Sequence, residues 1–436
     1  MDKDLLKFLR KCKTMVISTC GETPWSAKVY YALDRGFVFL VEKEGRTLKN
    51  IQKNCRVSFT IDTNRPDYFV QGEGCVKILG EPSEFHEERG SLLYKNPQDA
   101  LFVKSGHVYI ARLIPDYIKV TDMRNERKIY NAQFSLDELK ERKIGYFRAL
   151  RPWSFQQSIT ALVLGAILAP NFNLILFILS LISLTLLHGS FNAFSDYFDF
   201  ITNVDRPTTL GSSGSRVLVD RIMDPKKFLT YVISLFITGL IIGIVLTILK
   251  PQILPYVLIG LVAGILYGIP KIGCKWNALG DLAVFISFGP GIFLGSYVLQ
   301  GGVPGISEIL ISIALGLVIV AILHGNNWRD MDDDLMSGVR TVANILSEKG
   351  SMIYYLLLIW LSYPLFGLAV YFKPEFFPIL GSFLTIPWAV KLSKIALNKR
   401  NWNRNLLDLL TAQFTALHMY FSVGSMLIYI ILQHFL

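Results

Sequence analysis

An acidic cluster near the middle of the chain holds residues of the types that bind metal ions. Asn192, Asp196 and Asp199 are spaced i, i+4 and i+7, and Asp205 follows six residues later. This spacing puts the first three side chains on one face of a helix. The cluster ends a long apolar stretch, so the sequence predicts carboxylates gathered at one end of a helix.

A second cluster ends another apolar stretch. It holds Asn327, Arg329, Asp330 and Asp334, and its two aspartates share a helical face because they are spaced i, i+4. Carboxylates at the end of a membrane helix are costly and need compensating charge. Mg2+ supplies that charge, since it prefers oxygen ligands and shares its coordination shell with substrate phosphates. Two facing pairs of carboxylates could hold two ions and clamp a diphosphate between them.

The alternative is that these residues are solvated loop acids that cap two helices. A single cluster would leave both interpretations open. Two clusters on the same side of a membrane, each at the end of an apolar span, favour the metal site. Asp196, Asp199, Asp330 and Asp334 are therefore the predicted catalytic magnesium ligands.

Basic side chains accompany the two clusters. The loop after the fourth apolar stretch holds Tyr267, Lys271 and Lys275, and its lysines could neutralise diphosphate oxygens. Arg329 and Arg340 flank the second cluster and invite the same interpretation. Ordinary positive charges of cytoplasmic loops are the alternative for all of these cations.

Long apolar stretches must position these residues. Hydrophobic residues make up 52% of the 436 and charged residues 18%, which is too apolar for an ordinary soluble protein. Nine stretches have close to the ~20 residues that a helix needs to cross a bilayer. They run over 154–170, 173–194, 228–249, 252–269, 282–300, 307–324, 352–372, 375–391 and 410–433. Since hydrocarbon cannot satisfy backbone polar groups, these spans must be helices.

The charges of the loops predict the orientation. If the N-terminal part is cytoplasmic, the inward loops carry fifteen Lys and Arg residues, against only Lys250 and Lys373 outside. The fifteen are Arg206, Arg216, Arg221, Lys226, Lys227, Lys271, Lys275, Arg329, Arg340, Lys349, Lys391, Lys394, Lys399, Arg400 and Arg404. This bias predicts a multi-pass protein of the cell membrane with its acidic motifs in the cytoplasm. It also accounts for the net charge of +10 without a nucleic-acid partner.

The first 125 residues have a different pattern. Short runs rich in Val, Ile, Tyr and Phe, punctuated by Gly, Pro, Asn and Asp, predict strands. They cover 14–20, 26–33, 36–42, 55–61, 69–79 and 107–121, with helices expected at 46–53 and 84–93. This pattern predicts a small β-barrel with helical plugs (α+β), followed by a polar linker over 126–147. The five cysteines form no C-x-x-C pair, so neither a zinc site nor a disulfide framework is expected, only reduced thiols.

The membrane part, about 148–436, resembles the UbiA superfamily of intramembrane prenyltransferases. That family has an Asn-Asp-x-x-Asp type motif after its second helix and an Asp-x-x-x-Asp motif after its sixth. Asp196 with Asp199 matches the first motif, and Asp330 with Asp334 matches the second. The resemblance implies a bundle of nine helices that uses Mg2+ to ionise an isoprenyl diphosphate.

The resemblance also suggests which residues hold the substrate. The Tyr and Lys that the family has after helix four match Tyr267 and Lys271. The usual Asn of the first motif is Ser195 here, and Asn192, one turn earlier, is the candidate replacement. The predicted substrate-binding residues are Asn192, Asp205, Tyr267, Lys271, Asn327, Arg329 and Arg340.

Several stretches are similar to the branch that prenylates 1,4-dihydroxy-2-naphthoate in menaquinone synthesis. They are Asp196-Tyr-Phe-Asp-Phe, Asn327-Trp-Arg-Asp with Gly338-Val-Arg-Thr, and Phe288-Gly-Pro-Gly-Ile-Phe-Leu-Gly. The similarity implies an aromatic acceptor that attacks the allylic cation through carbon. Related branches prenylate 4-hydroxybenzoate, chlorophyllide or haem, or a glycerol-phosphate lipid through oxygen.

The N-terminal part resembles the flavin-binding split barrels of the pyridoxamine-phosphate-oxidase type. The resemblance rests on strand order, on Pro24-Trp-Ser-Ala-Lys-Val-Tyr-Tyr and on Glu44-Gly-Arg-Thr-Leu-Lys-Asn. It implies that Arg46, Thr47 and Lys49 contact the phosphate of FMN, and basic groups at a helix start suit an anion. It also implies a homodimer. A barrel that has lost its flavin and serves dimerisation or regulation is an equal alternative.

The sequence thus predicts two domains, a split barrel at 1–125 and a membrane prenyltransferase at 148–436. The expected reaction is Mg2+-dependent transfer from a polyprenyl diphosphate to a small aromatic acceptor, or to a lipid acceptor. A transporter is one alternative, although transporters place charged sites near the membrane midplane rather than at helix ends. A flavin reductase anchored in the membrane is another, although nine spans exceed what an anchor needs.

Overall fold

The computed structural model describes residues 2–63, 67–124, 127–141, 145–205, 214–398 and 406–435. Arg206, Lys399, Arg400 and Arg404, which contributed to the predicted charge bias, lie outside these ranges. The chain divides into two compact units. One comprises Met1–Gly145 with Asp205–Asp224, and the other Tyr146–Val204 with Pro225–Leu436.

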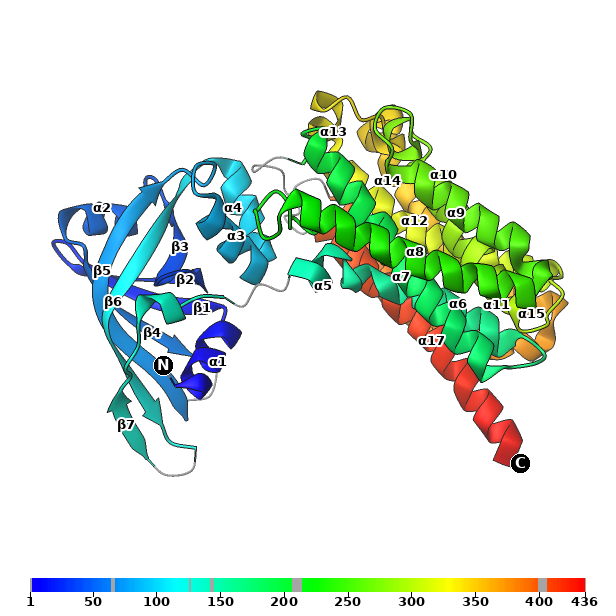
Figure 1. Cartoon of the computed structure of the whole chain (residues 1–436), viewed down its shortest axis with the longest axis horizontal. Helices are drawn as coiled ribbons and strands as arrows, with labels where there is room; N and C mark the ends of the chain where they lie inside the picture. Colours follow the sequence, from blue (N-terminus) through cyan, green and yellow to red (C-terminus); the bar gives the residue numbers. More distant parts are fainter. Residues whose placement is uncertain are drawn as a thin grey trace. The chain divides into compact units, whose positions relative to one another are not determined.

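Six antiparallel strands of the first unit close into a barrel, as predicted (Figure 1). They are β1 (Thr14–Cys20), β2 (Pro24–Leu33), β3 (Phe37–Glu42), β4 (Arg56–Asp62), β5 (Tyr68–Gly80) and β6 (Val108–Asp122). Their order is β3-β2-β1-β4-β5-β6, and β3 pairs with β6 to complete the ring. Closure leaves no unpaired edge within the ring, because every strand has two neighbours.

Short helices fill and cover the barrel. Helix α1 (Lys3–Lys11) buries Leu5 and Leu9 completely in the barrel core. The hydroxyl of Tyr31 in β2 donates to the Leu9 carbonyl at 2.7 Å, which ties the helix to the sheet. Helices α2 (Arg46–Lys53) and α3 (His86–Lys95) match the two predicted helices, and α4 (Ala100–Ser105) follows α3.

The segment predicted as a linker, 126–147, contains a short strand. Strand β7 (Lys128–Asn131) pairs antiparallel with the end of β6, from Lys119↔Asn131 to Asp122↔Lys128. Its four side chains are all exposed, so the apolar alternation that reveals a buried strand is missing from this stretch.

The expectation that all five thiols are reduced is wrong for one pair, since Cys55 and Cys75 form a disulfide. Cys55 directly precedes β4 and Cys75 lies in β5, so the pairing of these strands brings their Cα atoms to 4.9 Å. Twenty residues separate the two in sequence, so only the register of the strands reveals the contact. Cys12, Cys20 and Cys274 are free.

The second unit is a helical bundle, also as predicted (Figure 1). Its helices are α6 (Phe155–Leu168), α7 (Leu174–Ile201), α8 (Pro225–Leu249), α9 (Leu254–Gly268), α10 (Gly280–Ile286), α11 (Gly295–Leu299), α12 (Ile306–Arg329), α13 (Met331–Met336), α14 (Val342–Trp360), α15 (Ser362–Phe372), α16 (Ile386–Leu397) and α17 (Leu407–Phe435). Among the described residues, eight helical segments are long and apolar enough to cross a membrane. The remaining predicted span, 154–170, is the first along the chain. It corresponds to α6, whose 14 residues are too few for it to count among these eight.

Close backbone approaches hold the bundle together. A π-helical segment, Ser287–Leu294, joins α10 to α11 and packs between α6 and α12. Side chains at two glycines would collide with backbone there. A Cβ at Gly165 would lie 2.3 Å from the Phe293 carbonyl oxygen, and one at Gly289 would lie 2.3 Å from that of Ser312. Helix α12 contributes most of its apolar side chains to the core, and this packing positions its last turn, which holds Asn327 and Arg329 and directly precedes Asp330.

Candidate active site

The first acidic motif lies in the last turns of α7. Asn173 caps the start of the helix, and its side chain accepts a hydrogen bond from the Leu176 amide at 3.1 Å. Its 28 residues carry the chain across the membrane before the motif is reached. Asp196 and Asp199 are 4% and 2% exposed, so both carboxylates are desolvated and need positive partners.

Three carboxylates converge at this end of α7. Asp196, Asp199 and Asp205 each offer an oxygen within 4.8 Å of the others. In the part of the chain that the structure describes, this is the one group of three or more His, Cys, Asp or Glu residues close enough to share an ion. Asp199 Oδ1 is buried with no hydrogen-bond partner among these residues, so it has a free coordination position. A hard divalent cation fits this all-oxygen donor set.

Two basic side chains balance the cluster. Arg151, which precedes α6, donates through Nη2 to Asp196 Oδ1. Lys275 in the loop after α9 lies 2.6 Å from Asp199 Oδ2. Arg151 adopts a positive φ of 53°, an uncommon conformation for a non-glycine residue. Arg151 was not among the predicted site residues, although its place directly before an apolar stretch was a signal that could have identified it.

The Asn192 side chain contacts the segment before α6 rather than the carboxylates of the cluster. Its Nδ2 donates to the Leu150 carbonyl at 3.2 Å and to Ser154 Oγ at 2.9 Å. The amide therefore ties α7 to the segment that carries Arg151. Ser195 is buried on the side of α7 that faces α9, where a Cβ at Gly268 would lie 3.2 Å from its Cα.

The second motif is organised around Arg329, at the end of α12. Its Nε and Nη2 donate to Asp330 Oδ1 and Oδ2 at 2.8 and 2.5 Å. Its Nη1 donates to Asp408 Oδ2 at 2.7 Å, and its Nη2 also contacts Asn326 Oδ1 at 2.6 Å. Asp408, in the first turn of α17, was missed because it is an isolated acid far along the chain from the motifs. Asn327 is half-buried two residues before the end of α12.

Asp334 lies in α13, one turn after Asp330. Its amide donates to the Asp330 carbonyl at 2.9 Å, and its own carbonyl accepts from the Val339 amide at the same distance. The structure thus keeps Asp330 and Asp334 on consecutive turns, as their spacing predicts.

The loop after α9 contacts the first motif and Arg340, which follows the second motif. Its Lys275 pairs with Asp199, while the Trp276 carbonyl accepts from the Arg340 amide at 3.2 Å and the Ala278 amide donates to the Arg340 carbonyl at 2.7 Å. Arg340 therefore joins the site through its backbone, and its side chain is exposed. Lys271 is also exposed, at a positive φ of 67° in the turn.

A polar group inside the bundle adjoins this loop. The charged residues around Tyr267 include Lys275, Arg151 and Asp281. Asp281 is buried, and its Oδ2 lies 3.6 Å from Nδ1 of the fully buried His324, whose Nε2 contacts the Ser351 carbonyl at 3.1 Å. Asp281 and His324 were not among the predicted site residues, since each is a lone titratable residue at one end of an apolar span.

The predicted anion site of the barrel lies at the start of α2. Arg46 lies over the Trp25 ring at 4.9 Å and donates to Thr23 Oγ1. The Trp25 indole N–H donates to Thr47 Oγ1 at 3.2 Å. Lys49 is exposed on the same helix. A guanidinium group and two hydroxyls gathered at a helix start fit a phosphate group.

Comparison with known proteins adds family relationships to this geometry. Residues 158–431 match the model of the UbiA prenyltransferase family, and residues 1–103 match that of pyridoxamine 5'-phosphate oxidase. UbiA prenyltransferase domain-containing protein 1 of Xenopus tropicalis is 30% identical over 275 residues, which cover 61% of this chain and 77% of that protein. The Homo sapiens protein of the same name is 32% identical over 237 residues, or 52% and 69% of the two chains.

A solved structure shares the fold of the bundle. The UbiA homologue from Archaeoglobus fulgidus bound to GPP and Mg2+ matches with a TM-score of 0.50 and 16% identity, over 65% of this chain and 99% of that one. The family match covers more than half of the chain, and the relatives are matched over most of their length. The chain therefore belongs to the UbiA prenyltransferase family and is a multi-pass membrane prenyltransferase.

Proposed function

We propose that this protein transfers an isoprenyl group from a polyprenyl diphosphate to a small aromatic acceptor of the quinone-precursor type, with Mg2+ as its cofactor. The observation that carries the proposal is the carboxylate cluster of Asp196, Asp199 and Asp205, within 4.8 Å of one another at the end of a membrane helix. The GPP and Mg2+ bound to the Archaeoglobus fulgidus homologue support the same ligands here.

In this proposal, Asp196, Asp199 and Asp205 hold one ion, and Asp330 and Asp334 serve a second. Bound Mg2+ would supply positive charge next to the departing diphosphate. Arg151 and Lys275 pair with Asp196 and Asp199 of the first cluster. If these carboxylates held a divalent cation, both basic side chains would be available to the diphosphate oxygens. They would then stabilise the charge that develops on the leaving group.

The reaction breaks the bond between C1 of the isoprenyl group and the diphosphate oxygen. Both electrons of that bond leave with the diphosphate, and an acceptor carbon supplies the pair for the new bond to C1. The acceptor then loses the proton, or the carboxyl group, from the carbon attacked. The apolar spans of the bundle would house the isoprenyl chain.

The alternative acceptor is a glycerol-phosphate lipid prenylated through oxygen. Family membership supports prenyl transfer over the transporter and the anchored reductase. The aromatic acceptor rests on the similarity of the acidic motifs to the naphthoate branch, so the acceptor is the point that the experiment must decide.

The test uses the full chain in detergent with Mg2+ and a labelled isoprenyl diphosphate. It offers 1,4-dihydroxy-2-naphthoate, 4-hydroxybenzoate and a glycerol phosphate acceptor in parallel. We expect a labelled lipid product with the naphthoate acceptor, lost on chelation and in Asp199→Ala. Product with the glycerol phosphate alone would overturn the aromatic acceptor, and product that survives chelation would overturn the role of Mg2+.

For the barrel we propose binding of FMN with its phosphate at Arg46, Thr47 and Lys49. The match to the oxidase family over residues 1–103 and the cluster at the start of α2 support this site. Titration of the protein with FMN should quench flavin fluorescence, and Arg46→Ala should weaken binding at least tenfold. Equal binding by this variant and the unaltered protein would exclude the site.

A further inference from the structure

Arg151 holds a backbone conformation that its place in the sequence disfavours. Its φ of 53° lies in the left-handed region, which is uncommon for a residue other than glycine. Pro152 follows it, and steric contact with a proline ring pushes the preceding residue towards extended conformations. A residue keeps such a conformation only when the surrounding structure holds it there. Neighbouring groups must therefore hold Arg151 in place.

The Asn192 side chain contacts the chain on both sides of Arg151. Its Nδ2 donates to the carbonyl of Leu150, directly before Arg151, at 3.2 Å, and to Oγ of Ser154, three residues after it, at 2.9 Å. Since a carbonyl oxygen only accepts, the contact with Leu150 identifies this atom as the amide nitrogen. One amide group of α7 thus fixes two points that flank Arg151.

Ser154 passes this restraint on to the backbone of Arg151. Its Oγ donates to the Arg151 carbonyl at 2.8 Å, and its amide donates to the same oxygen at 2.9 Å. A hydroxyl has one hydrogen, so Ser154 Oγ accepts from Asn192 Nδ2 and from His188 Nε2, which lies 3.3 Å away. The Arg151 carbonyl is therefore fixed by a hydroxyl that two side chains of α7 hold in turn.

Helix α7 packs closely on this segment. A Cβ at Gly189 would lie 3.2 Å from Leu150 Cβ and 3.2 Å from Phe155 Cζ. The His188 ring packs against the Phe155 ring at a centroid distance of 5.4 Å, and its Nδ1 lies 2.9 Å from Ser158 Oγ. The polar contacts thus lie within a close-packed interface between α7 and the segment that carries Arg151.

The restraint ends at the carboxylate cluster. Arg151 donates through Nη2 to Oδ1 of Asp196, one of the three carboxylates that gather within 4.8 Å. We infer that Asn192 is a positioning residue for Arg151, and that it keeps the guanidinium group at the cluster, where a diphosphate oxygen would meet it. This inference rests on the proposed function. If Arg151 relaxed to an extended backbone, its side chain would turn away from Asp196 and from the diphosphate.

The experiment is a double-mutant cycle of Asn192→Ala and Arg151→Gln in the full chain, with the dissociation constant of labelled GPP measured in detergent with Mg2+. We expect Asn192→Ala to weaken binding about tenfold in the unaltered background but less than about twofold beside Arg151→Gln, because no guanidinium group is then left to position. Ser154→Ala should follow the same pattern. Ser190→Ala is the matched control and should bind GPP like the unaltered protein, since the Ser190 hydroxyl donates to the Leu186 carbonyl of its own helix at 2.7 Å.

Asn192→Asp separates positioning from metal binding. The aspartate keeps an oxygen ligand for Mg2+ but loses the N–H donors to Leu150 and Ser154, so it should weaken GPP binding about as much as Asn192→Ala does. Binding as tight as that of the unaltered protein would overturn the inference and assign Asn192 to the metal. An equal loss from Asn192→Ala in both backgrounds would also overturn it, since the amide would then act independently of Arg151.

A second readout needs no ligand. The Ser154 amide donates to the Arg151 carbonyl and should exchange its hydrogen faster in Asn192→Ala than in the unaltered protein or in Ser190→Ala. Unchanged exchange there would overturn the inference whether or not GPP binds, and if Asn192→Ala does not fold, Ser154→Ala takes its place in the cycle. If exchange and GPP binding change as expected but no acceptor is prenylated, the proposed function fails while the positioning role of Asn192 stands.

Discussion

At the scale of single residues, the site is defined by how its charges are paired. Lys275 and Arg151 neutralise Asp199 and Asp196, and Arg329 bridges Asp330 to Asp408. The acids were predictable because their spacing repeats along a helix. Most of their cationic partners come from distant segments, as Lys275 and Arg151 do, so no local pattern in the sequence identifies these pairs.

Asp99, in the N-terminal domain, allows a test at this scale. Burial raises the pKa of its carboxyl to about 7. Because the unfolded chain releases this proton near pH 4, the unfolded state binds fewer protons than the folded one between pH 4 and 7. The contribution of the Asp99 carboxyl to the free energy of unfolding is therefore complete below pH 4. It is lost as the pH rises through the folded-state pKa of about 7. The loss should amount to about 2 kcal/mol between pH 5 and 7.

The measurement is hydrogen exchange of buried barrel amides at both pH values, corrected for the intrinsic exchange rate. Asp99→Asn should remove the loss, since the amide does not titrate. An equal dependence on pH in this variant and in the unaltered protein would assign the effect to another group.

At the scale of elements, hydropathy predicts the membrane-spanning helices but does not predict how they pack against one another. Helix α6 and the π-helical segment Ser287–Leu294 approach closely at Gly165, where only a hydrogen atom fits. π-Helical turns are rare and concentrate at functional sites, and this one is continuous with α10, whose Asp281 lies beside His324. No periodicity in the sequence distinguishes this segment from an ordinary helix, and Pro290 alone hints at the irregularity.

Two glycines of the bundle form a matched pair for testing this packing. Gly165→Ala should destabilise the protein by about 1–3 kcal/mol, because its Cβ would lie 2.3 Å from the Phe293 carbonyl oxygen. Gly260→Ala adds the same methyl group with no atom within 4 Å and should leave stability unchanged or slightly higher. Thermal unfolding in the same detergent compares them, and equal transition temperatures would argue against close packing at Gly165.

At the scale of the whole molecule, the chain joins a barrel domain to a membrane enzyme, and the excess of Lys and Arg on one set of loops predicts which side the barrel faces. Cys20 reports on this, since it is an exposed thiol of the barrel, whereas Cys12 is buried. In a Cys274→Ser background, a membrane-impermeant maleimide should label the protein in inside-out vesicles and leave it unlabelled in intact cells. A Cys20→Ser variant of this background is the control that should lose the label. Labelling of intact cells would place the barrel outside.

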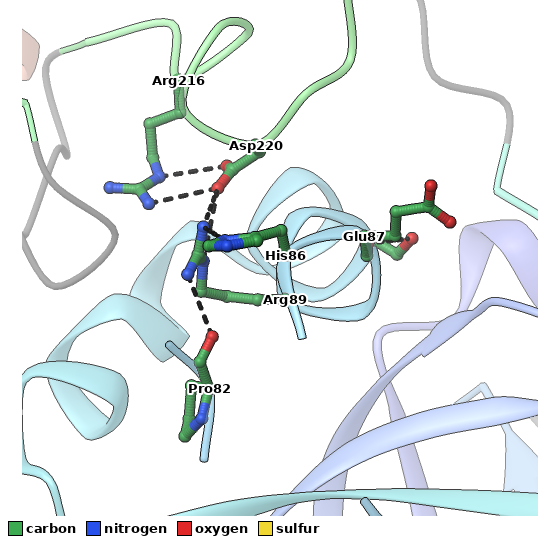
Figure 2. A network of polar contacts seen from close by, with 7 residues as sticks. Pro82, His86, Glu87, Arg89, Arg216 and Asp220 are labelled. Carbon is green, nitrogen blue, oxygen red and sulfur yellow. Dashed lines mark hydrogen bonds and ion pairs between the residues drawn. The ribbon is translucent and has the colours of Figure 1, made fainter. Parts of the chain in front are cut away.

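The sequence by itself determined the two-part architecture, the strands and helices of the barrel, the membrane spans and the two acidic motifs. These features depend on periodicity and on spacing within one element, which is local information. Only the tertiary structure decided that Cys55 pairs with Cys75 and which cation meets which carboxylate, as in the buried pair of Arg89 and Asp220 (Figure 2). Each of these is a contact between segments far apart in the chain, set by strand register or helix packing, and no local pattern encodes it.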